Sequence, residues 1–237
     1  MRQKPVHPAM QPFLDGKVIL LNKPLRWTSF DAVKKIRGLT GVSKVGHAGT
    51  LDPLATGLLI VCTGAFTKKI NEYMAQEKEY TGSFTLGSTT PTYDLESAPE
   101  NEKDISHLTN DEIISCTDNF TGEIEQTPPI HSAIKKDGKP VYLAARKGIE
   151  VKLEPRKIFI KEFEITKIDL PKVYFRVVCS TGTYIRTLAN DFGAKLNVGA
   201  HLSELCRTRI GNFKLEDAET IETFTQEIEA LKGAVQQ

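Results

Sequence analysis

The sequence predicts an α+β fold, because segments with the spacing of strands and of helices are interleaved along its 237 residues. Apolar runs at Val18–Leu21 and Leu58–Cys62 are typical of short buried strands. Apolar and polar residues alternate over Tyr80–Gly87 and Val173–Cys179, which is the pattern of a strand with one buried face. With 40% hydrophobic residues, a chain of this length can bury a sizeable core as one large domain or two small ones.

Helical segments lie between these strands. Three helices are predicted to start at Ser29 as an N-cap, at the capping box Thr109-x-x-Glu112, and at Ile185 after the turn Ser180–Tyr184. The acidic segment Glu216–Glu229 is predicted to form a closing helix. In the first helix the apolar residues Phe30, Val33 and Ile36 share one side, so Lys34 and Lys35 project elsewhere. This helix therefore carries positive charge.

The most informative stretch is the loop Val45–Gly57. Three of its residues, Gly46, Gly49 and Gly57, permit positive φ and a close approach of the backbone to a ligand. Pro53 stiffens the backbone that presents Asp52, which suits a nucleophilic carboxylate. The loop lacks the Gly-Lys-Ser/Thr ending of a phosphate-binding P-loop. Asp-Pro by itself is a favoured turn pair, so this dipeptide alone is equally consistent with a connecting turn that has no catalytic role.

Charge is distributed unevenly, although the net charge is only +1. Seven Lys or Arg stand against one acid over Lys17–His47, and eight stand against three acids over Lys135–Lys157. The compensating acids concentrate in Glu96–Glu112 and Glu216–Glu229. A polyanion could bind the basic segments, and an ordinary solvated surface is the alternative interpretation.

The remaining composition points to a cytoplasmic protein. The four cysteines are far apart, without zinc spacing, which favours buried reduced thiols. Residues 1–12 are polar, contain three prolines and lack the apolar core of a signal peptide, so we expect a disordered leader. No run reaches membrane-spanning length. We expect one domain over residues 13–237.

Separated motifs resemble the bacterial tRNA pseudouridine-55 synthases, the TruB-type family. They are Gly49-Thr-Leu-Asp-Pro-Leu-Ala-Thr-Gly57, Lys78-Glu-Tyr80, Gln126–Lys135, Gly182-Thr-Tyr-Ile-Arg186 and His201–Gly211. The resemblance covers about Val18–Phe213. It implies the pseudouridine-synthase fold, which is a mixed, mostly antiparallel sheet flanked by helices with a central RNA-binding cleft. Many family members carry a C-terminal RNA-binding PUA domain, for which we expect no room here.

The resemblance also implies roles for individual residues. Asp52 would be catalytic, Arg186 would pair with it, and Tyr184 would be the candidate general base. The expected substrate contacts are His47 pressing into the T-loop, Tyr80 stacking on the flipped base, Leu205 touching uracil, Tyr184 and Lys23. The expected contacts to the RNA backbone are Lys34, Lys35, Arg146 and Arg207.

The implied reaction explains why these residue types are needed. Pseudouridine formation breaks the glycosidic bond of uridine, turns the base and joins its C5 to C1′ of ribose, with no net redox change. We therefore expect neither a metal nor an organic cofactor. Asp52 could attack C1′ or C6, or act at C2′ by proton removal, and the sequence leaves these routes open. Because the target base lies inside a folded loop, it must be flipped out.

Three other functions fit the sequence less well. A non-catalytic RNA-binding or RNA-folding module would tolerate loss of Asp52, which this chain retains. A guide-RNA-dependent synthase subunit of the archaeal or eukaryotic type normally requires a PUA domain and partner proteins. A glycosidase usually needs two catalytic carboxylates, and the motif offers one. We therefore expect a monomeric enzyme that acts on the T-arm of tRNA, without a membrane or an obligatory protein partner.

Overall fold

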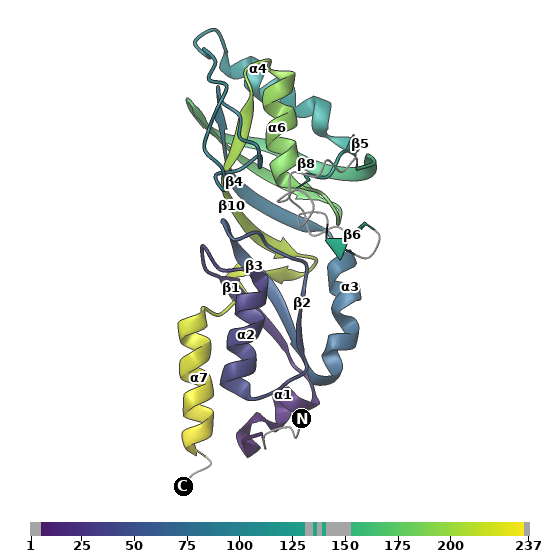
Figure 1. Cartoon of the computed structure of the whole chain (residues 1–237), viewed down its shortest axis with the longest axis vertical. Coiled ribbons are helices and arrows are strands. Elements are labelled where there is room, and N and C mark those ends of the chain that lie inside the picture. Colours follow the sequence, from purple (N-terminus) through teal and green to yellow (C-terminus); the bar gives the residue numbers. More distant parts are fainter. Residues whose placement is uncertain (1–5, 131–134, 137–138, 141–152, 235–237) are drawn as a thin grey trace. The chain divides into compact units, whose positions relative to one another are not determined.

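The computed structural model describes residues 6–130, 135–136, 139–140 and 153–234 of the chain. The fold divides into two compact units. Unit 1 comprises Met1–Tyr80 and Cys206–Gln237, and unit 2 comprises Thr81–Leu205. Strands β4 (Lys78–Leu86) and β10 (Ala200–Ile210) contribute residues to both units (Figure 1).

The sheet of unit 1 is organised around β3 (Ala55–Thr63). Strand β1 (Val18–Lys23) pairs antiparallel with β3, from Val18 opposite Cys62 to Lys23 opposite Gly57. Strand β2 (Val45–Ala48) pairs with the end of β3, β10 follows β3 in the strand order, and β11 (Phe213–Lys214) pairs with β10. The predicted loop Val45–Gly57 is therefore shorter in the structure, because its first four residues form β2 and its last three begin β3.

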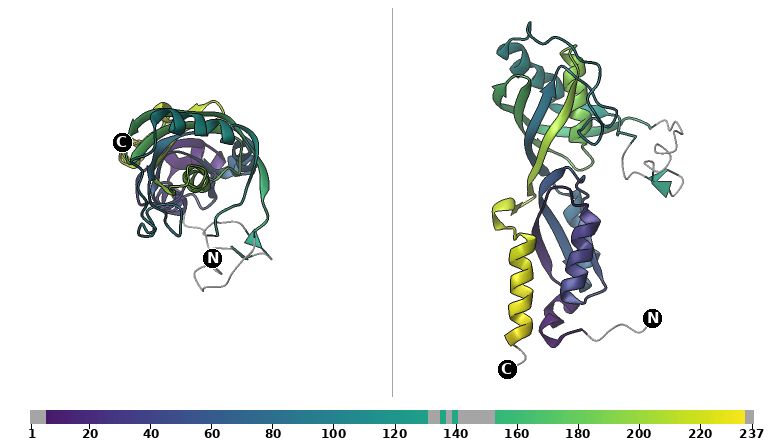
Figure 2. Two further views of the ribbon diagram at one scale, coloured as in Figure 1. Left: turned by 90° about the horizontal axis from the view of Figure 1, so that it is seen from above. Right: turned by 60° about the vertical axis from the view of Figure 1, so that its left-hand side comes forward.

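Both faces of β3 are buried. Leu59 and Val61 pack in one cluster with residues of α1 (Gln11–Asp15), α2 (Ser29–Thr40) and α7 (Ile221–Ala234). Leu58, Ile60 and Cys62 pack in a second cluster, covered by residues of η2 (Gly64–Lys69) and α3 (Ile70–Ala75). Burial on two faces explains why this strand is a continuous apolar run. Helices α2 and α7 lie side by side (Figures 1 and 2), and Lys232 Nζ donates to the Leu39 carbonyl at 2.5 Å.

Two details of unit 1 correct the sequence prediction. Thr28, rather than Ser29, is the N-cap of α2, because Thr28 and Asp31 form a reciprocal capping box. Phe30 is 61% exposed, and the buried side of α2 is formed by Ala32, Val33 and Ile36.

The predicted disordered leader is too long. Residues Pro8–Met10 form the short helix η1, which runs directly into α1, and Met10 is fully buried in the core of unit 1. The apolar contact of Met10 fixes this part of the chain. Residues 1–5 lie outside the described part.

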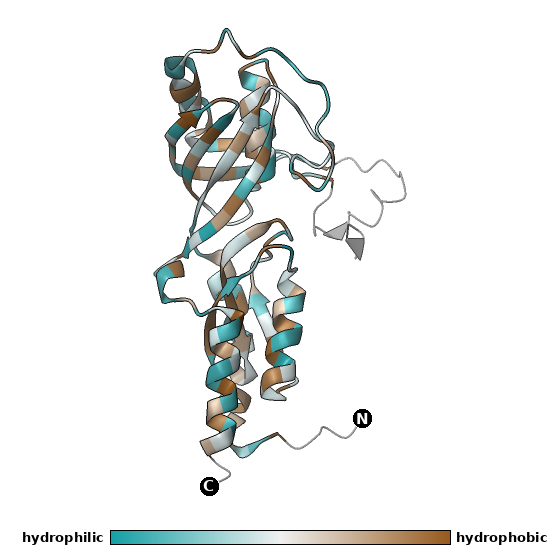
Figure 3. Cartoon of the chain, turned by 90° about the vertical axis from the view of Figure 1, so that its left-hand side faces the viewer, coloured by the Kyte–Doolittle hydropathy of each residue, from teal (hydrophilic) through white to brown (hydrophobic). Residues whose placement is uncertain are grey.

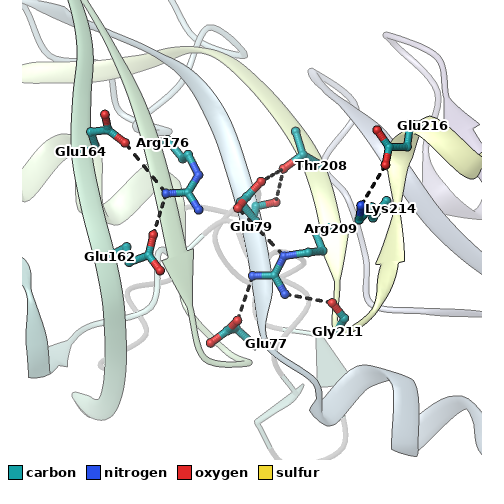
Figure 4. Close-up of polar contacts among 10 residues, drawn as sticks. All are labelled: Glu77, Glu79, Glu162, Glu164, Arg176, Thr208, Arg209, Gly211, Lys214 and Glu216. Atoms are coloured by element: carbon teal, nitrogen blue, oxygen red, sulfur yellow. Dashed lines mark hydrogen bonds and ion pairs between the residues drawn. The ribbon is translucent and has the colours of Figure 1, made fainter.

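Unit 1 also holds the start of β4 against the end of β10 by polar contacts (Figure 4). Arg209 Nη2 contacts Glu77 at 2.8 Å, and Arg209 Nη1 donates to the Gly211 carbonyl. Thr208 Oγ1 donates to Glu79 at 2.8 Å. The pair Arg209–Glu77 is partly exposed, so its contribution to stability is small and its main effect is on register.

Unit 2 continues the strand order as β10-β4-β9-β8-β5, with β5 (Gly122–Gln126), β8 (Arg156–Asp169) and β9 (Lys172–Cys179). Helices α4 (Asn110–Ser115), η3 (Cys116–Phe120) and α6 (Ile185–Lys195) accompany this sheet, and β6 (Lys135–Lys136) pairs with β7 (Lys139–Pro140). The core is a phenylalanine cluster, in which Phe84 stacks on Phe175 at 4.3 Å and Phe192 of α6 joins them.

The predicted α+β class with a mostly antiparallel sheet is confirmed. The pairs β1–β3, β2–β3, β5–β8, β8–β9 and β10–β11 are all antiparallel. Apolar and polar bands alternate along the strands and helices (Figure 3). Cys62, Cys116 and Cys179 are buried thiols, whereas Cys206 is half-buried. Within the described ranges, every helix is too short or too polar to cross a membrane.

Candidate active site

The backbone around Asp52 in unit 1 is fixed by three elements. The buried hydroxyl of Ser29, in α2, accepts a hydrogen bond from Leu51 N at 2.9 Å and donates to the Leu51 carbonyl at 3.2 Å. On the other side of Asp52, the Pro53 carbonyl accepts from Arg26 N at 2.7 Å. Ala55 N donates to the Asp52 carbonyl at 3.0 Å and closes the turn into β3. The half-buried carboxylate is therefore presented from a rigid backbone, as the sequence predicts.

Two glycines of this loop have the predicted positive φ. Gly49 has a φ of 84° and Gly57 a φ of 101°. The close approach at Gly57 differs from the expected one, because a Cβ there would lie 2.4 Å from the Arg207 carbonyl oxygen. Gly57 therefore brings β3 close to the backbone of β10 rather than to a ligand.

Two buried cations support the loop from inside unit 1. Arg207, 1% exposed, donates from Nε to the Leu58 carbonyl at 2.8 Å and from Nη2 to the Gly49 carbonyl at 3.1 Å. Lys23, fully buried, donates from Nζ to the carbonyls of Pro24 and Trp27 at 3.0 and 2.6 Å. These placements correct two predictions, since buried side chains bonded to the loop backbone offer no surface to an RNA phosphate or a substrate.

The charges of these groups influence one another. Burial lowers the pKa of the Lys23 ammonium to about 8, while the Asp52 carboxylate acts in the opposite direction and Arg207 adds to the lowering. Burial also lowers the pKa of His47, and the nearby Arg207 adds to that effect. His47 is therefore a neutral, half-buried ring at neutral pH.

Tyr80 completes the predicted residues of unit 1. It lies on β4, and its side chain is partly exposed. Two residues earlier, the ammonium of Lys78 is buried and donates to the carbonyls of Met74 and Gln76, which anchors the start of the strand. The Lys-Glu-Tyr motif thus combines an anchoring lysine with an accessible aromatic ring.

Arg186 in unit 2 lies at the start of α6 and has a carboxylate partner that the sequence did not predict. Its Nε lies 3.7 Å from Asp94 Oδ2, with both side chains 5% exposed, and its Nη1 donates to the Thr92 carbonyl at 3.2 Å. Asp94 is held in turn, because Oδ1 accepts from Thr92 Oγ1 at 2.7 Å and from Glu96 N at 3.0 Å. The segment of residues 87–102 is rich in polar and turn residues, and paired hydrogen bonds between Thr89 and Glu100 join its two ends.

Tyr184 is the residue before α6, and Gln126 fixes its backbone. The buried Gln126 amide accepts from Tyr184 N at 2.7 Å through Oε1 and donates to the Tyr184 carbonyl at 3.0 Å through Nε2. Leu205, the predicted apolar contact to uracil, is partly exposed on β10. Unit 2 thus positions Tyr184 and Arg186 by two separate sets of contacts.

The predicted site residues are therefore divided between the units. Asp52, His47 and Lys23 belong to unit 1, where Lys23 and Asp52 interact electrostatically, whereas Arg186 and Tyr184 belong to unit 2. The predicted pairing of Asp52 with Arg186 joins the two units and stays a prediction. Of the expected RNA-backbone contacts, Lys34 is exposed and Lys35 half-exposed on α2, and Arg146 lies outside the described residues, as does most of the basic segment Lys135–Lys157.

Sequence analysis missed Ser29, Asp94 and Gln126 as positioning residues. Asp94 could have been found in Thr90-Pro-Thr-Tyr-Asp94, since alternating threonines next to an aspartate favour side-chain-to-backbone turns. Gln126 opens a motif that resembles the family, but a single glutamine gives no local signal of its partner 58 residues later. The sequence indicates a cap at Ser29, because capping is the commonest use of a serine at such a position.

Comparison with known proteins identifies the family. The model of the TruB family pseudouridylate synthase N-terminal domain matches residues 37–185, and that of the tRNA pseudouridylate synthase B C-terminal domain matches residues 186–236. The chain belongs to the TruB family of pseudouridylate synthases. It is 51% identical to tRNA pseudouridine synthase B of Flavobacterium johnsoniae, over 92% of this chain and 99% of that protein. It is 48% identical to the synthase of Phocaeicola vulgatus, over 90% of this chain and 94% of that protein.

This TruB-family chain also has the same fold as chains in several solved structures. The Cbf5 subunit of a Cbf5–Nop10–Gar1 complex superimposes with a TM-score of 0.72 and 32% identity, over 92% of this chain and 56% of that chain. An H/ACA ribonucleoprotein bound to a substrate RNA containing 2′-deoxyuridine gives a TM-score of 0.68 and 28% identity, over 95% and 59% of the two chains. The pseudouridine-synthase fold expected from the sequence is thereby confirmed.

Proposed function

We propose that this protein isomerises uridine 55 in the T-loop of tRNA to pseudouridine, with Asp52 as the nucleophile. Membership of the TruB family and the near-complete coverage of relatives called tRNA pseudouridine synthase B support the reaction and the substrate. The observation that carries the role of Asp52 is the rigid loop, whose backbone is bonded to Ser29, Arg26 and Arg207 around a half-buried carboxylate.

The surroundings of Asp52 suit a carboxylate nucleophile. The attraction between Lys23 and Asp52 is mutual, so Lys23 stabilises the ionised form of the carboxylate. Pre-positioning of a reacting group removes entropy from the barrier, since the group need not be ordered during the reaction. Attack at C1′, attack at C6 and proton removal at C2′ all use this same ionised oxygen.

Residues of unit 2 would complete the reaction. A guanidinium has five N–H donors, so Arg186 can keep its contacts to Asp94 and Thr92 and also bind Asp52. Tyr184, held by Gln126, serves as the general base, and Leu205 contacts uracil. The neutral ring of His47 suits insertion into the T-loop, because a neutral ring can enter a base stack with little desolvation cost. Tyr80 stacks on the flipped base.

We further propose that the enzyme acts in the cytoplasm as a monomer, without a protein partner or a cofactor. The chain spans 99% of one relative called tRNA pseudouridine synthase B, but only 56% of the Cbf5 chain found in a complex with Nop10 and Gar1. The similarity to Cbf5 therefore supports the fold, and the similarity to the full-length bacterial relatives supports a stand-alone enzyme.

Mapping of pseudouridine in an unmodified tRNA transcript tests this function. The wild-type protein should modify the T-loop uridine alone, and Asp52→Asn should modify none while still binding tRNA. The matched control is Asp169→Asn, which removes a 65%-exposed carboxylate at the end of β8 and should keep full activity. If the wild-type protein bound tRNA and left every uridine unchanged, the protein would be an RNA-binding module instead.

A further inference from the structure

A groove on the surface of unit 1 has no role in the reaction described above. Its volume is about 580 Å³, within the range of about 300–1,000 Å³ that is common for small-ligand sites. It is formed by the turn before α2 and by the outer side of α2, with Arg26, Trp27, Lys34, Lys35, Gly38 and Leu39 among its lining residues. All of these residues belong to one unit, so its geometry is defined within unit 1.

The floor of the groove is apolar. Trp27 and Leu39 are half-buried, and both pack against the core cluster that contains Leu59 and Val61. Each therefore presents one side to the core and another to the groove. The absence of a side chain at Gly38, where a Cβ would meet nothing within 4 Å, leaves the groove open beside this floor.

The rim of the groove is positively charged. Arg26 and Lys34 are exposed and Lys35 is half-exposed, and none of the three forms an ion pair with another residue of the described ranges. The one acid of the lining, Asp31, already accepts hydrogen bonds from Thr28 N at 2.9 Å and Thr28 Oγ1 at 2.6 Å. Asp31 keeps its negative charge and interacts with Lys34, so one carboxylate stands against three cations and the excess positive charge of the rim is suited to a phosphate.

Arg26 has a backbone conformation that disfavours its own side chain. Its φ is 67°, in the left-handed region that glycine adopts most easily. The conformation is imposed from outside, because Arg26 N donates to the Pro53 carbonyl and Lys23 Nζ binds both ends of the turn, Pro24 and Trp27. A glycine would satisfy the same backbone at lower strain, so the backbone conformation does not account for an arginine at this position.

We propose that this groove is a nucleotide subsite for the RNA substrate, in which a base packs on Trp27 and Leu39 while its phosphate binds Arg26, Lys34 and Lys35. An aromatic floor beside a basic rim is the usual arrangement for unpaired nucleotides. The hydrogen bond from Arg26 N to Pro53 places the subsite next to the Asp52 loop. The subsite rests on the proposed function, since it is assigned to the same RNA.

A protein partner with an acidic surface is the competing occupant. Such a partner would need the charged rim, but its binding would not depend on a planar ring at Trp27. Base stacking and phosphate binding also differ in their response to salt, because only the phosphate contact releases counterions. Separate removal of the ring and of the charge therefore distinguishes the two occupants.

The experiment uses full-length Asp52→Asn protein and an unmodified tRNA transcript, so that binding is measured without turnover. Trp27 is the only tryptophan of the chain, so its emission reports directly on the groove. Saturation with tRNA should quench this emission. Arg26→Gly should weaken the Kd about 8-fold at about 0.1 M salt and reduce the salt slope by about 0.9, the effect of one phosphate contact. Trp27→Leu lacks this reporter, so its Kd is measured by filter binding; it should be weakened about 5- to 100-fold with an unchanged salt slope.

The controls separate binding from folding. Arg26→Gly should keep its Tm within about 2 °C, because relief of strain offsets the greater entropy of glycine in the unfolded chain. Lys68→Gln removes an exposed charge from η2, whose Phe66 packs on the opposite face of β3, and should leave the Kd unchanged. Unchanged Kd values for both Arg26→Gly and Trp27→Leu would overturn the subsite even if the wild-type protein makes pseudouridine. If both variants bound tRNA more weakly but the wild-type protein made no pseudouridine, the proposed subsite would stand and the proposed enzymatic function would be rejected.

Discussion

Ser29 offers the sharpest test of whether the fold positions the Asp52 carboxylate. Its buried hydroxyl binds both polar groups of the Leu51 backbone, directly before Asp52. Ser29→Ala removes these two hydrogen bonds. Each contributes about 0.5–1.5 kcal/mol, so the variant should lose about 1–3 kcal/mol of its free energy of unfolding. For a chain of this size the Tm should fall by about 2–4 °C for each kcal/mol lost.

The turnover of Ser29→Ala should fall more than its stability suggests. A displacement of about 1 Å in a reacting group can lower kcat about 100-fold, and the loop would lose its contact immediately before Asp52, the proposed nucleophile. We expect kcat for pseudouridine formation to fall about 10- to 100-fold at a temperature where the variant is fully folded. The Kd for tRNA should remain unchanged, because the buried hydroxyl has no access to RNA.

The same helix supplies a matched control. Thr40, at the other end of α2, is also buried, and its hydroxyl donates to the Ile36 carbonyl at 2.8 Å and accepts from Val42 N at 3.3 Å. Thr40→Val removes two hydrogen bonds at a distance from the loop and should lower the Tm by a similar amount while leaving kcat unchanged. If both variants lost stability and both kept the wild-type kcat, Ser29 would not position Asp52.

Three further predictions follow from buried polar groups. The free energy of unfolding should rise by up to about 3 kcal/mol between pH 8 and 10.5, because Lys23 in the unfolded chain keeps a proton that the folded form has released. Urea unfolding at several pH values measures this rise, which should be smaller for Lys23→Met than for the wild-type protein. Asp94→Ala should cost about 3 kcal/mol in unfolding free energy, because it removes one partner of a buried ion pair with Arg186, and it should reduce kcat; an unchanged denaturation midpoint would contradict this. Gln126→Leu should lower kcat without changing the Kd for tRNA, because it releases the backbone of Tyr184; equal kcat values would refute the positioning role.

The sequence predicts the helices and strands of this fold better than it predicts which of them pack against one another. The run Leu58–Cys62 and the alternation of Val173–Cys179 each fix a strand, because periodicity depends on neighbouring residues alone. Phe30 shows the limit of this reasoning, because it fits the apolar spacing of α2 and yet is exposed. The side of a helix that is buried depends on the sheet and helices around it, and local spacing does not contain that information.

The candidate site shows the same difference between what local sequence predicts and what long-range packing decides. The rigid presentation of Asp52 could be predicted from Gly49 and Pro53, since both restrict or permit backbone angles locally. The burial of Arg207 could not, because an arginine that donates to carbonyls of a loop 158 residues earlier is indistinguishable in sequence from a surface arginine. Motifs near Arg207 suggested a phosphate contact, and long-range packing assigned it to the backbone instead.

The two buried cations of unit 1 suit both roles that we propose for the Asp52 loop, in catalysis and in RNA binding. Lys23 and Arg207 are bonded to neutral carbonyls rather than to carboxylates, so their positive charges are not cancelled by their hydrogen-bond partners. In a low-dielectric interior such charges act over a longer range than exposed ones. The resulting potential favours the anion of Asp52 and attracts the phosphates of an approaching RNA. Replacement of either cation should therefore reduce both kcat and tRNA affinity, whereas loss of an exposed lysine such as Lys34 should reduce affinity alone.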